Sequence, residues 1–265
     1  DREAHKRGTS VYLLDLVIPM LPEALSNDLC SLREGVDRLA MSVLLRYDAK
    51  AKLQETTFAE SVIRSDRRFS YERASRVMDR SAREKGPVGD LLLDMARLAA
   101  LLKRGRPSHD LPRQEIDLVF DGQGDVVDLR PTVQDEAHGV IEEFMLAANR
   151  EVARLLRRRG VATIYRHHPE PADLSGVWET LRRLGVASEK STHLGRALAT
   201  AAAKGYGPTV TAAMLRCMPS AVYTTASSSH FSLGFDTYTH FTSPIRRYSD
   251  LVVHRQLRGV LRDHG

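Results

Sequence analysis

Residues 242–248 of the chain, Thr-Ser-Pro-Ile-Arg-Arg-Tyr, combine the residue types that bind an anion. Thr242 or Ser243 is expected to cap a helix that begins at Pro244, where the missing N–H of proline costs nothing. Arg246 and Arg247 then fall in the first turn, where the helix dipole disfavours each by about 0.3–1 kcal/mol. Free amides, hydroxyls and paired guanidinium groups together suit a phosphate. We therefore interpret this corner as a phosphate-binding site.

A purely structural interpretation of the same segment stays open. Arg246 would pair with Asp250, which follows four residues later on the predicted helix, and Arg247 would pair with a carboxylate elsewhere. The sequence favours neither interpretation over the other.

Glu142 is a second candidate for chemistry. It follows Ile141 and shares a predicted helix face with Met145 and Asn149, so part of its carboxylate is expected to be protected from water. Such a carboxylate is either one half of a structural ion pair or an acid that positions a substrate or a hydrated metal. Glu143 is expected to face solvent.

Aromatic and histidine residues give weaker signals. An isolated tyrosine such as Tyr12 or Tyr71 usually fills a core, and stacking on a nucleobase is the more specific alternative. The ten histidines show no ligand spacing typical of zinc, so no zinc site is predicted.

The elements that must position these residues follow from periodicity and from turn residues. Alternation at period two predicts antiparallel hairpins over 39–63 and 116–129, the second with positive φ at Gly122 and Gly124. An irregular loop is expected from Pro19 to Leu29. The stripe Ile141, Met145, Ala148, Val152 and Leu155 is expected to be the buried face of the longest helix. Helices are predicted over 71–80, 88–103, 137–159, 175–184, 192–204, 210–215 and 244–261; the first two are expected to pack on the sheet, and a short strand is predicted at 221–224.

Composition limits the class of protein. The 265 residues are 42% hydrophobic and 28% charged, with a net charge of +5, which excludes disordered and fibrous classes and allows an anionic partner. The most apolar windows are interrupted by charges, so no membrane partner is expected. Cys30 and Cys217 are too few for a disulfide framework and are expected to be reduced and buried in a cytoplasmic protein.

Several segments, in order, carry a resemblance to a known family. They are Arg-Gly-Thr-Ser-Val-Tyr at 7–12, Val-Ile-Pro-Met-Leu-Pro at 17–22, Leu-Cys-Ser-Leu at 29–32, Ser-Val-Ile-Arg-Ser at 61–65, Ile-Glu-Glu-Phe-Met at 141–145 with Ala-Asn at 148–149, and Tyr-Thr-His-Phe-Thr-Ser-Pro-Ile-Arg-Arg-Tyr at 238–248. Together they resemble the RNB catalytic domain of the ribonuclease II and ribonuclease R family.

The resemblance implies a mixed α/β fold of the RNB type, with antiparallel hairpins and sheet surrounded by helices, as one catalytic domain over 1–265 that is expected to be incomplete at its N-terminus. It also implies a processive 3′-to-5′ exoribonuclease that hydrolyses single-stranded RNA to nucleoside 5′-monophosphates through two Mg²⁺ ions. In the family the metal ligands come from an Asp-Phe-Asp-Asp-Ala-type motif upstream of the segment at 7–12. We therefore expect no metal ligands here, and we expect the cold-shock-type and OB-fold domains to lie outside these residues.

The resemblance assigns roles residue by residue. Tyr71 matches the active-site tyrosine, Glu142 the glutamate near the terminal nucleotide, and Arg246 the arginine that clamps the terminal phosphates. Tyr12 matches one jaw of an aromatic clamp on the last base, and His109 stands where the other jaw, usually Phe, is expected. The further expected RNA contacts are Arg7, Ser10, His138, Thr242, Ser243, Arg247 and Tyr248.

Two other functions are weighed against this one. A non-catalytic RNA-binding protein would keep the RNB fold without the metal-binding aspartates, and a structural scaffold would keep the fold alone. The 3′ end of single-stranded RNA is the expected partner, and nothing in the sequence indicates an obligate protein partner.

Overall fold

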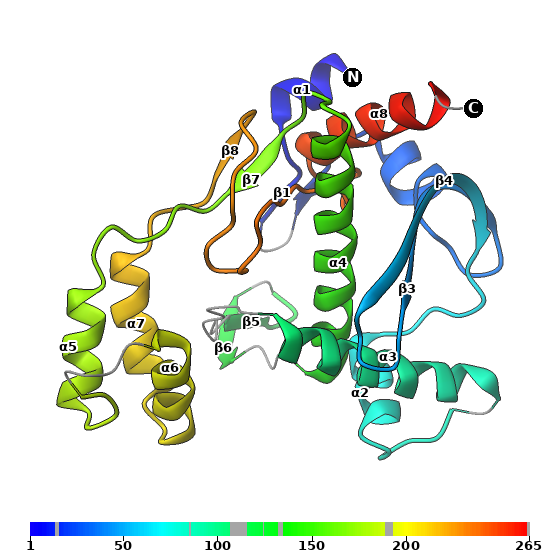
Figure 1. The fold of residues 1–265 in the computed structure, drawn as a ribbon. Helices are drawn as coiled ribbons and strands as arrows, with labels where there is room; N and C mark the ends of the chain where they lie inside the picture. Colours follow the sequence, from blue (N-terminus) through cyan, green and yellow to red (C-terminus); the bar gives the residue numbers. More distant parts are fainter. Residues whose placement is uncertain are drawn as a thin grey trace. The chain divides into compact units, whose positions relative to one another are not determined.

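The computed structural model describes residues 1–13, 16–84, 86–106, 116–123, 125–131, 135–188 and 193–263 (Figure 1). Its contacts divide the chain into two compact units. Unit 1 comprises Asp1–Gly105, Val133–Tyr165 and Thr239–Gly265, and unit 2 comprises Arg106–Thr132 and Arg166–Tyr238. The first, the middle and the last part of the chain therefore fold together in unit 1.

Unit 1 contains an antiparallel hairpin of β3 (Asp37–Tyr47) and β4 (Leu53–Arg64). At its turn, Asp48 Oδ1 accepts hydrogen bonds from the backbone N–H groups of Lys50 and Lys52, both at 2.9 Å. The predicted hairpin is confirmed. A second, short pair in unit 1 joins β1 (Val11–Tyr12) to β2 (Val17–Ile18).

Helices α2 (Tyr71–Met78) and α3 (Pro87–Gly105) pack on the first half of α4 (Glu136–Arg158). Ser70 caps α2 as predicted, because its hydroxyl accepts the Arg73 N–H at 3.3 Å. The shared core is apolar and contains Ala74, Val77, Met78, Leu92, Ala96, Ala99, Ala137 and Val140. The expectation that α2 and α3 pack on the sheet is wrong, because α4 offers them this apolar stripe.

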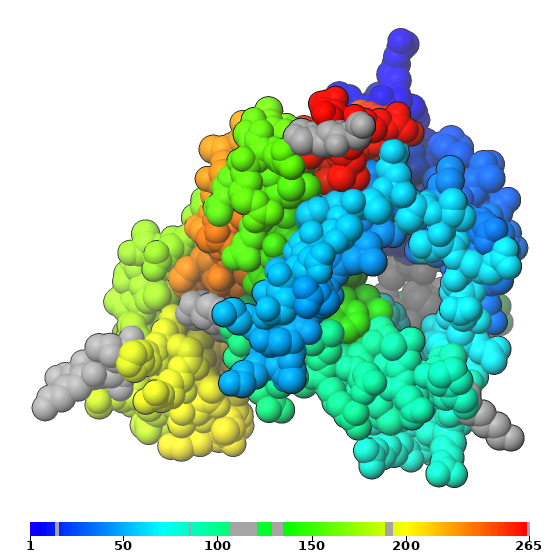
Figure 2. All heavy atoms as spheres, turned by 45° about the vertical axis from the view of Figure 1, so that its right-hand side comes forward, coloured from blue at the N-terminus to red at the C-terminus, as the bar shows by residue number. Residues whose placement is uncertain are grey.

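The second half of α4 packs on α8 (Tyr248–Arg262) and on the hairpin. The core there contains Val152, Leu156, Phe241, Val253 and Leu257, with Met41, Val43 and Phe58 from the hairpin packed against it. Figure 2 shows α8 (red) against β4 (light blue) on this face, where Arg262 and Glu60 pair at 3.1 Å. Helix α4 thus contributes buried residues to both of these cores of unit 1.

Unit 2 has its own core, formed by α5 (Ser175–Arg183), α6 (Leu194–Ala203) and α7 (Gly207–Cys217). The hairpin of β5 (Ile116–Phe120) and β6 (Val126–Pro131) also belongs to it. A further pair joins β7 (Tyr165–His167), which begins in unit 1, to β8 (Val222–Thr224). The predicted mixed α/β class with antiparallel hairpins and surrounding helices is confirmed.

The chain begins with a short helix, α1 (Arg2–Arg7), for which no prediction was made. Three local predictions differ from the structure. The expected loop before Leu29 contains a π-helix, Ala24–Leu29. Cys30 ends that helix and is exposed, because no residue of the π-helix is buried, and Cys217 is partly exposed. Gly122 has no positive φ, because Asp121 Oδ1 closes the turn by accepting the N–H groups of Gln123 and Asp125; Gly124 lies outside the described residues.

The described part of the chain contains no helix that is both long and apolar enough to cross a membrane.

Candidate functional site

The turn at residues 242–247, which we call the arginine turn, precedes α8 instead of forming its first turn. The helix begins at Tyr248, and Arg247 occupies the N-cap position with extended backbone (φ −133°, ψ 124°). The backbone N–H groups of Arg246 and Arg247 both bond to Ser243 O, which closes a tight turn around Pro244. The prediction of a helix from Pro244 with two arginines in its first turn is therefore wrong, and the dipole argument no longer applies to Arg246.

The two arginines of this turn have different environments. Arg247 Nη2 lies 2.8 Å from Asp250 Oδ1, and the Asp250 side chain is 0% exposed. Arg246 is exposed, and its guanidinium has no ion pair or hydrogen bond with any residue in the described part of the chain. Asp250, the partner that the structural interpretation gave to Arg246, thus pairs with Arg247 instead, which leaves Arg246 able to bind an anion.

Three other polar groups of the arginine turn are either bonded to the protein or buried in it. Ser243 donates its backbone N–H to Asp250 Oδ1 at 2.8 Å. Thr242 Oγ1 and Arg247 Nε are buried and have no hydrogen-bond partner among the described residues. An unsatisfied buried donor costs about 1–3 kcal/mol, so a ligand oxygen or water reaching either atom would stabilise the turn.

The first residues of the chain close the other side of the turn. The Ser10 N–H and the Thr9 hydroxyl donate to Arg246 O at 3.0 and 2.9 Å, and the Tyr248 N–H donates to Gly8 O at 2.9 Å. The Ser10 hydroxyl accepts the Met20 N–H at 2.9 Å, and Ser10 is 8% exposed. Ser10 therefore has little surface left for RNA.

Three further predicted RNA contacts lie near this segment. Tyr12 on β1 is 60% exposed, which leaves its ring open to stacking. Arg7 pairs with Glu3 at 2.8 Å and donates to Pro19 O at 2.6 Å, so its guanidinium holds the chain as well as facing solvent. Tyr248 donates its hydroxyl to Asp1 at 3.2 Å and lies edge-on to His5.

Tyr71 and His138 come together from the first turns of α2 and α4. Their rings stack with centroids 3.7 Å apart and planes 17° apart, and Tyr71 is 45% exposed. Asp135 caps α4 by accepting the His138 N–H at 3.1 Å, and it also contacts His138 Nδ1 at 2.7 Å. Burial raises the pKa of Asp135, but hydrogen bonds from Ser75 and His138 outweigh it and leave the pKa below its ordinary value. The cap thus holds a carboxylate and an imidazole beside Tyr71.

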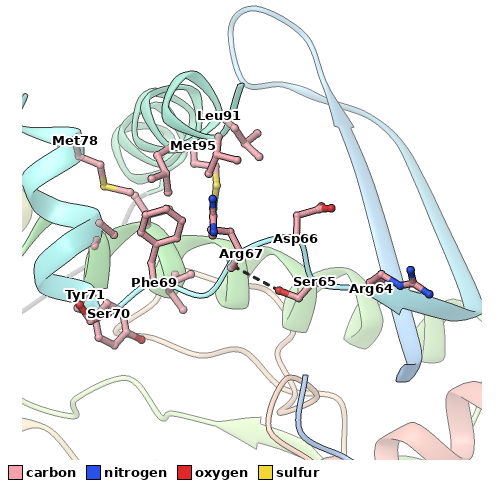
Figure 3. Close-up of a pocket in the computed structure, with 16 residues that line it drawn as sticks. Arg64, Ser65, Asp66, Arg67, Phe69, Ser70, Tyr71, Met78, Leu91 and Met95 are labelled. Atoms are coloured by element: carbon pink, nitrogen blue, oxygen red, sulfur yellow. Dashed lines mark hydrogen bonds between the residues drawn. The ribbon is translucent and has the colours of Figure 1, made fainter. Parts of the chain in front are cut away.

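A pocket of about 470 Å³ opens beside this pair in unit 1 (Figure 3). Phe69, Met78 and Met95 form its apolar part. Arg64 and Asp66 line the end of the pocket that lies away from Tyr71. Ser70 and Tyr71 belong to the lining, so the pocket is continuous with the exposed tyrosine. Its surroundings suit a flat apolar group better than a bare phosphate.

Glu142 and Glu143 exchange the environments predicted for them. Glu142 is exposed and Glu143 is 5% exposed, while Ile141, expected in the buried stripe, is 39% exposed. The buried face of α4 in fact runs through Ala137, Val140, Glu143, Leu146, Ala147, Asn149, Val152, Ala153 and Leu156. The prediction placed the face one residue away because it took Ile141 as an anchor. The role of Glu142 near a terminal nucleotide stays a prediction, now for a solvent-facing carboxylate.

Two expectations concern His109 and a metal site. His109, the expected second aromatic jaw, lies outside the described residues. A metal site was not expected here, and among the described residues no group of three or more His, Cys, Asp or Glu side chains could hold a metal ion. The described residues therefore do not fit the Mg²⁺ ions that the resemblance implies, and we assign no chemical step to a metal.

The sequence analysis did not predict the contacts that Asn149, Asp250 and Asp135 make in the structure. A signal for Asp135 was present, because an aspartate three residues before His138 at a helix start is a typical N-cap. Asp250 was expected to pair with Arg246 but pairs with Arg247, and Asn149 contacts residues 92 and 93 positions away, which no local pattern indicates.

Comparison with known proteins identifies the family. A family model described as the RNB domain matches residues 1–263. The chain belongs to the RNB family. RNB nucleases are generally metal-dependent. Ribonuclease R of Thermotoga maritima is 39% identical to this RNB chain over 278 residues, covering 100% of the chain and 39% of that protein.

Two solved structures share this RNB fold. Mycoplasma genitalium RNase R in complex with ribose-methylated single-stranded RNA matches with a TM-score of 0.88 at 30% identity, covering 97% of this chain and 42% of that one. Yeast Ssd1, a pseudonuclease, matches with a TM-score of 0.79 at 22% identity, covering 100% of this chain and 34% of that one, which shows the fold alone. The chain spans less than half the length of each of these relatives.

Proposed function

We propose that this RNB chain is part of a processive 3′-to-5′ exoribonuclease that hydrolyses single-stranded RNA to nucleoside 5′-monophosphates. The observation that carries the proposal is Arg246: an exposed guanidinium, without a partner in the described part of the chain, on a turn that buried side chains hold. The likeness to RNase R, one structure of which contains single-stranded RNA, supports it.

Each site residue receives a role that its environment can support. Arg246 would bind the phosphates at the 3′ end and neutralise the charge that gathers on the scissile phosphate. Tyr12, exposed on β1, would stack on the terminal base, with a gain of about 1–3 kcal/mol. Tyr71, stacked on His138, would bound the reacting end, and Glu142 would face it from α4.

The remaining predicted contacts divide by their environment. Thr242 and Arg247 carry buried donors without partners among the described residues, so they would contribute to anion binding if the turn opens slightly. Arg7, Ser243 and Tyr248 would act mainly by holding the turn and the first segment together. The metal that the family needs is proposed to be Mg²⁺, bound by residues of the longer protein, and the proposed location is the cytoplasm.

The test uses the full-length parent protein and a single-stranded RNA labelled throughout its length. Release of nucleoside 5′-monophosphates from the 3′ end is expected in the presence of Mg²⁺, and Arg246→Ala is expected to slow it by roughly 100-fold, the typical cost of one charge-stabilising group. Gln256→Leu is the matched control, because Gln256 lies on α8 and contacts the 162–163 segment instead of the arginine turn. Absence of mononucleotide products from the wild-type protein would contradict the proposal.

A non-catalytic RNA-binding protein is the second candidate. It is favoured by the absence of a metal-binding group among the described residues and by the fold of the pseudonuclease Ssd1. The same assay separates the two functions, since this candidate predicts salt-sensitive binding of the RNA without any shortening of it.

A further inference from the structure

The arginine turn depends on side chains from two helices for its shape. Only two of its own backbone N–H groups, those of Arg246 and Arg247, bond within the turn, both to Ser243 O. Its other backbone hydrogen bonds are made to α4, to the first turn of α8 and to the first segment of the chain. The position of Arg246 is therefore set from outside the turn.

Asn149 holds the start of the turn from α4. Its side chain is 2% exposed, and its Oδ1 accepts the N–H groups of Phe241 at 2.9 Å and Thr242 at 3.1 Å. Asn149 is fixed in turn by its helix, because Val152 and Leu156 are 0% exposed in the core below it. A buried amide oxygen that accepts two N–H groups leaves this stretch of backbone little freedom.

Asp250 holds the end of the turn from α8. One carboxylate oxygen accepts the Ser243 N–H and pairs with Arg247 Nη2, each at 2.8 Å, and the other accepts the Ser249 hydroxyl at 3.2 Å. Because this buried carboxylate engages Arg247, it leaves Arg246 as the exposed arginine of the pair. Charge-assisted bonds of this length are strong where water is excluded.

We propose that Asn149 and Asp250 are positioning residues for Arg246: by fixing both ends of the turn, and by engaging Arg247, they present the Arg246 guanidinium to the RNA phosphate without touching RNA themselves. The inference rests on the proposed nuclease function. Reaction geometry is sensitive to such positioning, since a displacement of about 1 Å can cost roughly 100-fold in rate.

The first experiment measures steady-state kinetics of the full-length protein on single-stranded RNA. Asn149→Leu keeps the side-chain volume and removes the acceptor, and Asp250→Asn keeps an acceptor for Ser243 but removes the charge facing Arg247. Both are expected to lower kcat by roughly 10- to 100-fold at a temperature where each variant is fully folded by circular dichroism. Gln256→Leu also removes two side-chain hydrogen bonds made by α8, and it is expected to leave kcat unchanged.

The second experiment is a double-mutant cycle with Arg246→Ala, which distinguishes positioning from general loss of structure. If Asn149 and Asp250 act through Arg246, each substitution is expected to change kcat by less than about twofold once Arg246 is already alanine. Equal effects in the presence and absence of Arg246 would overturn the inference. Values of kcat within about twofold of wild type for both single variants would also overturn it, because a twofold change lies within the usual error of additivity.

The two proposals fail in different ways. If Arg246→Ala alone leaves RNA degradation unchanged, or if the parent protein releases no mononucleotides, the proposed function fails and the inference fails with it. If Arg246→Ala slows degradation while the cycle is additive, the function stands and only the positioning role is refuted. Should Asn149→Leu not fold, Asp250→Asn alone completes the cycle, because it retains the buried hydrogen bond to Ser243.

Discussion

The ring of His138 stacks on the ring of Tyr71 at a centroid distance of 3.7 Å, and Asp135 Oδ1 holds the far side of the imidazole at 2.7 Å from Nδ1. One N-cap therefore begins the longest helix and also orients an aromatic pair at the candidate site. The stability of α4 and the placement of Tyr71 are linked through this single carboxylate.

Asp135→Ala is expected to lower the free energy of unfolding by about 1–2 kcal/mol, because α4 loses its cap. Asp135→Asn is the control, since asparagine caps equally well while removing the charge beside His138. The folded-state pKa of Asp135 lies below its ordinary value of 3.8, so its contribution is present above about pH 4 and is lost as the pH falls further. Urea unfolding at pH 7 measures the effect; identical midpoints for the alanine variant and wild type would refute the capping role.

Tyr12→Ala in the full-length protein is expected to change the length of the smallest RNA product, because the terminal base loses its stacking partner. Stability should change by less than about 0.5 kcal/mol, since Tyr12 is 60% exposed. Tyr12→Phe keeps the ring and is expected to give the wild-type products. Denaturing gels of the digest read out the lengths, and an unchanged ladder for the alanine variant would count against the clamp.

The stability of unit 2 is expected to fall as the medium becomes acidic. His168 and His230 are 6% and 8% exposed with ring centroids 5.1 Å apart, near Arg166 and His167. Burial lowers the pKa of both, that of His230 to about 3. The folded state therefore keeps them neutral, while the unfolded chain binds protons below about pH 6.5.

The dependence of stability on histidine protonation is confined to a defined pH range. Above about pH 6.5 these histidines contribute no pH dependence, and below it unfolding becomes easier by at most about 1.4 kcal/mol per pH unit for each proton taken up. Urea midpoints at pH 7 and pH 5 measure the change. His230→Gln does not titrate and should reduce the difference between the two pH values; an equal difference would show that His230 is not responsible.

Removal of divalent metal is expected to stop RNA hydrolysis by the parent protein but not RNA binding by this chain. The described residues contain no group of side chains suited to a metal ion. Filter binding of single-stranded RNA with EDTA or with Mg²⁺ at constant ionic strength tests this. An RNA affinity that rises more than tenfold when Mg²⁺ replaces EDTA would point to a metal site within these residues.

The sequence predicted the elements whose signals are local. The β3–β4 hairpin follows from alternation and from Asp48 at its turn, and α2 follows from Ser70 as its cap. The extent of α4 was also correct within one residue at each end. In each case the residues that make the deciding contacts are close together in the sequence, so a local sequence pattern indicates the element.

The errors fall where distant contacts decide the structure. Pro244 is typical of a helix start, but Asn149, Asp250 and the first segment hold residues 242–247 as a turn, so α8 begins later. The environments of Glu142 and Glu143 depend on which face of α4 meets α2 and α3, which the sequence alone did not determine. The motifs of the candidate site were found by resemblance, while the residues that support them required the structure.

The hydrogen bond from the Thr9 hydroxyl to Arg246 O joins residues 237 positions apart. Contacts of such separation form late, because the intervening chain must first be ordered. On the ribosome, the first segment and α4 emerge well before the arginine that they help to place. A nascent chain would therefore lack the assembled arginine turn until Asp250 has left the exit tunnel.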